Sequence, residues 1–107
     1  MKKRLRAFVE HHPEGWNHDE WQALLAELAQ NGSKVSDPAE VGLELEKTRL
    51  EWELARRSLK GLGPKRREAL VDRYQTLWRL KQAPVEDVAG VPTITRSLAE
   101  QVVQAIQ

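Results

Sequence analysis

The chain turns at residues 59–67, Leu59-Lys60-Gly61-Leu62-Gly63-Pro64-Lys65-Arg66-Arg67. One helical pattern ends at this stretch, and a basic helix begins after it. Gly61 and Gly63 have no Cβ and can adopt a positive φ, so their amides can approach a ligand closely. Pro64 suits the first position of the new helix. Because a helix start carries unpaired N–H groups and a partial positive charge, the stretch predicts a phosphate-binding turn.

Positive charge is concentrated beside this turn. Residues 60–81 hold seven Lys or Arg against two Asp or Glu, whereas residues 1–59 hold nine against eleven and residues 82–107 hold one against three. The net charge of +1 for the whole chain conceals this uneven distribution. A local basic excess is typical of an anion-binding surface, and a solvated basic helix face is the alternative.

The composition favours a small helical protein without a bound metal or cofactor. The 107 residues suffice for one compact domain, or for a small domain with an added helical layer. Apolar runs are only a few residues long, so neither a membrane span nor a secretory signal is expected. The chain has no cysteine, which is compatible with the cytoplasm. Its three histidines lack the helical spacing of metal ligands, so we expect no metal site.

Residues 1–51 are expected to form an N-terminal helical extension. It comprises a short helix, a capped helix and the first part of a long helix, at residues 3–11, 18–30 and 38–58. Asn17 with Glu20, and Asp37 with Glu40, have the spacing of capping boxes at the starts of the second and third helices.

The long helix carries two opposed apolar stripes, so it needs a partner on each side. One stripe holds Val41, Leu45, Thr48, Trp52, Ala55 and Leu59, and the other holds Leu43, Leu50 and Leu54. We expect the N-terminal helix on one side, and the C-terminal helices or a second protein chain on the other. Glu53 and Arg57 lie four residues apart on a polar flank and predict a solvated ion pair.

Residues 52–107 are expected to form a second helical domain. A helix from Lys65 to Tyr74 is followed by a short helix that Thr76 caps, by one or two turns at residues 85–89, and by a last helix that Thr95 caps. No stretch alternates apolar and polar residues in the manner of a strand. The predicted fold class is therefore all-α, with the N-terminal helices and the long helix packed on a C-terminal helical bundle.

The C-terminal half contains two units of helix, tight turn and helix about 30 residues apart. It resembles a tandem helix-hairpin-helix domain, and in particular the C-terminal domain of UvrC-type excision nucleases and the related module of XPF-type nucleases. The first hairpin and its connector are carried by residues 60–67, Ala69-Leu70 and Thr76-Leu77, and the second by residues 91–95 with Leu98-Ala99. Trp78 falls in the connector helix.

The resemblance implies binding to the DNA backbone through hairpin amides and nearby basic side chains, without sequence readout. Thr93 stands where the family usually has glycine, and Gln75 likewise replaces the usual glycine after the helix that ends at Tyr74. A Cβ at residue 93 would strain the turn or hinder close approach. The implied contacts are Gly61, Leu62, Gly63, Lys65, Arg66 and Arg67 at the first hairpin, and Thr93, Ile94, Thr95, Arg96 and Ser97 at the second.

These features predict a non-catalytic, sequence-independent DNA-binding module, with DNA repair or recombination as its setting. The alternative is a protein-interaction or dimerisation module that uses a degenerate helix-hairpin-helix fold and the long helix. An enzyme is disfavoured, because the chemistry of helix-hairpin-helix enzymes lies in other residues and this chain places its carboxylates on exposed helix faces.

Overall fold

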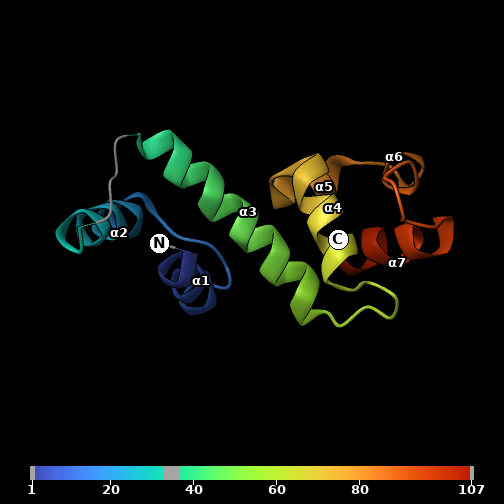
Figure 1. Ribbon diagram of the computed structural model, residues 1–107, viewed down its shortest axis with the longest axis horizontal. Coiled ribbons are helices and arrows are strands. Elements are labelled where there is room, and N and C mark those ends of the chain that lie inside the picture. Colours follow the sequence, from blue (N-terminus) through green and yellow to red (C-terminus); the bar gives the residue numbers. More distant parts are fainter. Residues whose placement is uncertain (1, 33–36, 107) are drawn as a thin grey trace.

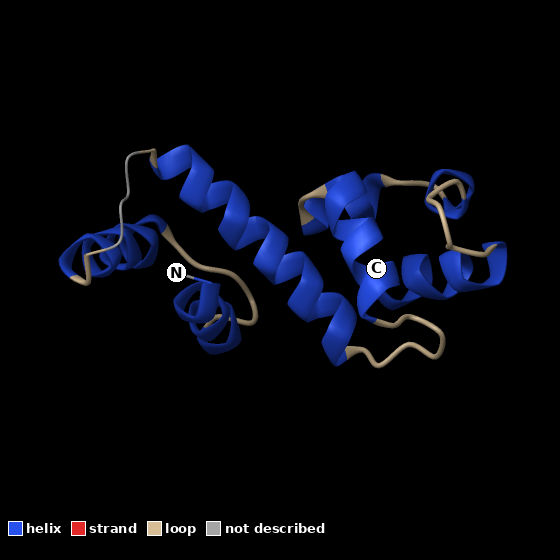
Figure 2. Cartoon of the chain, in the orientation of Figure 1, coloured by secondary structure: helices blue, strands red, loops and turns tan. Residues whose placement is uncertain are grey.

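The computed structural model describes residues 2–32 and 37–106, and every regular element in these ranges is a helix (Figures 1 and 2). The predicted all-α class is therefore confirmed. The molecule is elongated, with extents of 45 × 23 × 21 Å. No described helix combines the length and the apolar character needed to cross a bilayer. The helices are α1 (Lys2–His11), α2 (His18–Gln30), α3 (Pro38–Arg56), α4 (Pro64–Tyr74), α5 (Leu77–Gln82), α6 (Val85–Ala89) and α7 (Arg96–Ile106).

Short polar side chains start three of the helices as the sequence predicts. The Asn17 side chain accepts a hydrogen bond from the Glu20 amide at 2.8 Å, and the Glu20 carboxylate accepts one from the Asn17 amide at 3.0 Å. The hydroxyls of Thr76 and Thr95 each accept a bond from the amide three residues on, at 3.1 and 3.2 Å. These contacts satisfy amides that the first turn of each helix leaves unpaired.

The long helix α3 differs from the prediction at both ends. The Asp37 side chain accepts from the amide of Ala39 at 3.0 Å and not from that of Glu40, so the predicted second capping box is wrong. The helix ends at Arg56 and not at residue 58, because Ser58 has a φ of +50° that no right-handed helix can contain.

Two hydrophobic clusters share α3, and Figure 1 shows this helix running diagonally between α1 and α2 on one side and α4 to α7 on the other. One cluster contains Val41 and Leu45 with side chains of α1 and α2, and the other contains Leu50 and Leu54 with side chains of α4 to α7. The predicted cover on both sides of the long helix is thus confirmed, and the C-terminal helices supply the second side. The domain boundary at residue 52 stays a prediction.

Two residues of the predicted stripes lie elsewhere. Leu43 is 38% exposed and does not belong to the buried part of its stripe. Leu59 packs against the C-terminal cluster and not beside Val41 and Leu45, because the chain has already left the helix at that point.

Glu53 is buried, which corrects the prediction of a solvated ion pair. Its side chain is only 5% exposed, and its carboxylate lies 2.5 Å from the Arg57 guanidinium and 3.5 Å from that of Arg56. Arg57 also donates to the carbonyl oxygen of Ala105 at 2.6 Å. The pair therefore joins the end of α3 to the last turn of α7.

Tyr74 on α4 contacts Asp87 on α6. Its hydroxyl donates to the Asp87 carboxylate at 2.6 Å, and Arg73 lies 3.2 Å from the same carboxylate. Burial, together with the hydrogen bond to Asp87, raises the pKa of Tyr74 above its ordinary value. Since the unfolded chain loses this proton at about pH 10, the native state holds it at a pH where the unfolded state does not.

We expect Tyr74→Phe to lower the free energy of unfolding by about 1 kcal/mol at pH 7, because one buried hydrogen bond is lost. The contribution of Tyr74 is complete below about pH 10 and declines as the pH rises further, since only the unfolded state then ionises freely. Urea unfolding of both proteins at pH 7, 9 and 10.5 measures the difference. A difference that stays constant across this range would contradict the assigned role of the hydroxyl.

Candidate nucleic-acid interface

Hairpin 1, which we define as residues 59–63, joins α3 to α4. Its turn closes through a hydrogen bond from the Leu62 amide to the Leu59 carbonyl at 3.1 Å, and the Leu62 side chain is buried in the C-terminal cluster. Gly61 has a φ of +88°, a conformation that its lack of a Cβ permits. Gly63 has an extended backbone, with φ at −79° and ψ at 180°, and serves as the cap residue of α4. Only one of the two glycines therefore needs a positive φ.

Six backbone amides around hairpin 1 have no hydrogen-bond partner among the described residues: Leu59, Lys60, Gly61, Gly63, Lys65 and Arg66. Helical bonding resumes with the amide of Arg67, which donates to the Gly63 carbonyl at 3.0 Å. These amides belong to the hairpin and the first turn of an 11-residue helix, where the helix dipole favours an anion.

Basic side chains flank the free amides. Lys60 and Lys65 are exposed, and Arg66 donates from its guanidinium to the Gly61 carbonyl at 2.5 Å. None of these three cations pairs with a carboxylate in the part of the chain that the structure describes. An open depression follows the hairpin and is lined by Leu59, residues 61–63, Pro64, Lys65 and Arg66.

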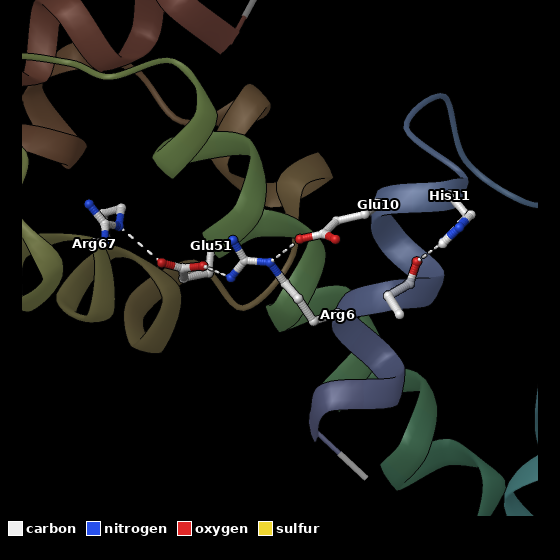
Figure 3. Close-up of polar contacts among 6 residues, drawn as sticks. Arg6, Glu10, His11, Glu51 and Arg67 are labelled. Atoms are coloured by element: carbon white, nitrogen blue, oxygen red, sulfur yellow. Dashed lines mark hydrogen bonds and ion pairs between the residues drawn. The ribbon is translucent and has the colours of Figure 1, made fainter.

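Arg67 is placed differently from Lys60 and Lys65. Its Nε donates to Glu51 on α3 at 3.0 Å, its terminal nitrogen donates to the Leu62 carbonyl at 3.2 Å, and its side chain is 21% exposed. Figure 3 shows the guanidinium directed at Glu51. Arg67 thus fastens the hairpin to α3, whereas Lys60 and Lys65 extend into solvent.

Hairpin 2, which we define as residues 91–95, repeats this backbone 32 positions later. Its turn closes through the same bond, from the Ile94 amide to the Val91 carbonyl at 3.1 Å, and the Ile94 side chain is buried. Thr93 takes the place of Gly61 and has a φ of +73°. The turn therefore keeps the shape that glycine would give it, and a β-branched residue bears the strain.

The charges around hairpin 2 are reversed. Arg96 lies 3.6 Å from Glu86 and 3.4 Å from Glu100, so two carboxylates surround its only basic side chain. Ser97 is exposed and uncharged, and the Thr95 hydroxyl is used in capping α7. The structure thus gives the two hairpins the same backbone and opposite local charge.

Sequence reasoning omitted three residues from the site. Lys60 is exposed beside Gly61 and was identifiable from its place in the basic stretch. Glu51 is linked to the hairpin through Arg67, and Arg6 is linked to it through Glu51. No spacing in the sequence indicates these contacts. Within residues 2–32 and 37–106, no group of three His, Asp or Glu side chains could hold a metal ion.

Part of the chain is similar to UvrC proteins, which confirms the resemblance to UvrC-type nucleases over that segment. It is 47% identical over 49 residues to the UvrABC system protein C of Aliivibrio salmonicida, and 49% identical over 49 residues to that of Vibrio parahaemolyticus. With the protein of the same name from Symbiobacterium thermophilum, the identity is 48% over 46 residues.

The matched segment is a minor part of both proteins. It covers 46% of this chain and 8% of the UvrC protein from Aliivibrio salmonicida, so the chain spans less than a tenth of such a relative. No protein-family model matches the chain. No solved structure shows a significant match to it.

Proposed function

We propose that the chain is a non-catalytic module that binds the DNA backbone without reading sequence, and that hairpin 1 is its principal contact. The observation that carries this proposal is the set of six unpaired amides around hairpin 1, beside three cations without carboxylate partners among the described residues. Amides at a helix start and unpaired Lys or Arg side chains both suit phosphate oxygens. Neither feature distinguishes one base from another.

Hairpin 2 makes a weaker contact in this proposal. Thr93, Thr95, Arg96 and Ser97 offer backbone amides in the same arrangement as hairpin 1, but Glu86 and Glu100 repel a phosphate that approaches them. Leu62 and Ile94 contribute through the hairpin backbone, since both side chains are buried. The similarity to UvrC supports DNA repair as the setting.

The alternative of dimerisation through the long helix has less support. Both sides of α3 are covered within the chain, which leaves Leu43 as its exposed large apolar residue among those described. Trp78 on α5 is 69% exposed and is the residue that a protein partner would be expected to cover.

Fluorescence anisotropy with labelled duplex and forked DNA tests the proposal. We expect wild-type binding in the micromolar range near physiological salt, with a slope of log K against log salt of about −2 to −3 for two or three neutralised phosphates. Lys65→Glu/Arg66→Glu should lower the affinity at 50 mM salt by at least roughly 30-fold, because two attractive charges become repulsive.

The matched control is Arg79→Glu/Lys81→Glu, which changes the net charge equally on exposed positions of α5. It should lose clearly less affinity than the hairpin variant. Equal losses would show that net charge, and not hairpin 1, governs binding. No binding by folded wild type at low salt would refute the DNA proposal, and Trp78→Ala would then be tested in partner capture.

A further inference from the structure

A chain of ionic contacts runs from the N-terminal helix to Arg67 in the first turn of α4 (Figure 3). Arg6 on α1 contacts Glu10 at 3.0 Å and Glu51 on α3 at 3.1 Å. The other oxygen of Glu51 accepts from Arg67 at 3.0 Å. Arg67 in turn donates to the carbonyl of Leu62 at 3.2 Å. Helices α1, α3 and α4 are thereby connected to one peptide group of the hairpin.

That peptide group contains a proposed phosphate contact. The Leu62 carbonyl and the Gly63 N–H belong to the same planar unit, in which the C=O and N–H bonds point in opposite directions. Arg67 donates to the carbonyl, so the Gly63 N–H is directed away from the Arg67 guanidinium. Gly63 has no side chain to restrict its own backbone, and a Cβ built on it would meet nothing within 4 Å. The side-chain bond from Arg67 to the Leu62 carbonyl therefore acts directly on the orientation of this amide, in addition to the backbone bonds that close the turn and start α4.

We infer that Arg67 is a positioning residue, and that α1 and Glu51 hold it so that the Gly63 amide is preset for phosphate. This inference rests on the proposed function, and it gives the N-terminal extension a role at hairpin 1. A direct phosphate contact by Arg67 is the competing assignment. The two assignments differ in whether a lysine could replace Arg67. A lysine can still contact a phosphate directly, whereas the simultaneous contacts to Glu51 and to the Leu62 carbonyl need the forked guanidinium.

Arg67→Lys and Arg67→Gln separate these assignments. For a positioning residue, Arg67→Lys lowers DNA affinity about two- to fivefold, the amount expected for one partly exposed ion pair, although the charge is kept. Arg67→Gln leaves the salt slope unchanged, because no phosphate contact is removed. Lys65→Gln, in contrast, reduces the slope by about 0.9. A direct contact would give the reverse: Arg67→Lys would retain affinity, and Arg67→Gln would lose about 0.9 in slope.

Backbone 15N relaxation measures the positioning itself without DNA. We expect the order parameter of Gly63 to fall from about 0.85 towards about 0.6 in Arg67→Lys and to fall detectably in Arg6→Ala. The matched control is Arg4→Ala, which removes the same charge from α1 but breaks a contact to Glu27 on α2, at 2.6 Å. Arg4→Ala should leave Gly63 as rigid as in wild type.

The readouts keep this inference distinct from the proposed function. One outcome overturns the inference and leaves the proposed function standing. In it, wild type binds DNA and Lys65→Glu/Arg66→Glu does not, while Arg67→Lys has the DNA affinity and the Gly63 order parameter of wild type. If wild type does not bind DNA but Gly63 loosens in Arg67→Lys and Arg6→Ala, the positioning network is supported and the function fails. If the order parameter of Gly63 is equal in Arg6→Ala and Arg4→Ala, α1 does not take part in holding Arg67.

Discussion

Converting hairpin 2 into a second phosphate site should raise DNA affinity by about tenfold at 50 mM salt. The variant is Thr93→Gly/Glu86→Gln/Glu100→Gln. It leaves Arg96 without the two carboxylates that now lie 3.6 and 3.4 Å away, and it removes the side chain that hinders close approach to the turn. The salt slope should steepen by about 0.9, which corresponds to one more neutralised phosphate.

Thr93→Gly by itself should raise the free energy of unfolding by about 0.5–1 kcal/mol. Thr93 has a φ of +73°, a conformation that costs a β-branched residue more than it costs glycine, and part of the gain is offset by the greater freedom of glycine in the unfolded chain. Thermal or urea unfolding measures this change separately from DNA binding.

The control for charge is Glu14→Gln/Glu40→Gln, which neutralises two exposed carboxylates outside both hairpins. It should increase affinity less than the hairpin 2 variant and should not steepen the slope. If both variants raise the affinity and change the salt slope equally, long-range charge accounts for the gain in affinity. Hairpin 2 would then not contact the DNA backbone, even with glycine in its turn as in hairpin 1.

Arg57→Ala should lower the free energy of unfolding by about 3 kcal/mol. The change leaves the Glu53 carboxylate buried beside only Arg56, which is 3.5 Å away, and such an uncompensated buried charge is costly. It also removes the bond from Arg57 to the Ala105 carbonyl, which ties α3 to α7. Urea unfolding followed by circular dichroism measures the loss.

The neighbouring Arg56 provides a matched control. It is 47% exposed, approaches Glu53 less closely, and its guanidinium lies 4.8 Å from the Trp52 ring centroid. Arg56→Ala should cost at most about 1 kcal/mol. Similar losses in both variants would indicate that Glu53 is more accessible to water than its 5% exposure implies.

The sequence was sufficient to place the helices and the first hairpin, because the signals for them are local. Asn17, Thr76 and Thr95 cap the amides three residues on, and a cap of this kind depends only on neighbours in the chain. The spacing of apolar residues in α3 similarly predicted that both of its sides would be covered. The same local reasoning placed the end of α3 two residues too far and gave Glu40 a capping role that it does not have.

Only the tertiary structure decided how the charged side chains are used. Glu53 and Arg57 look like an ordinary surface pair at a spacing of four residues, and burial between α3 and α7 makes their contact structural. Arg67 belongs to the same basic run as Lys65, yet it contacts Glu51 sixteen residues earlier. Likewise, the sequence showed that Thr93 replaces a glycine, but only the fold showed that the turn keeps its positive φ. Helix starts follow from short-range geometry, whereas the partner of a long charged side chain is set by which helices pack together.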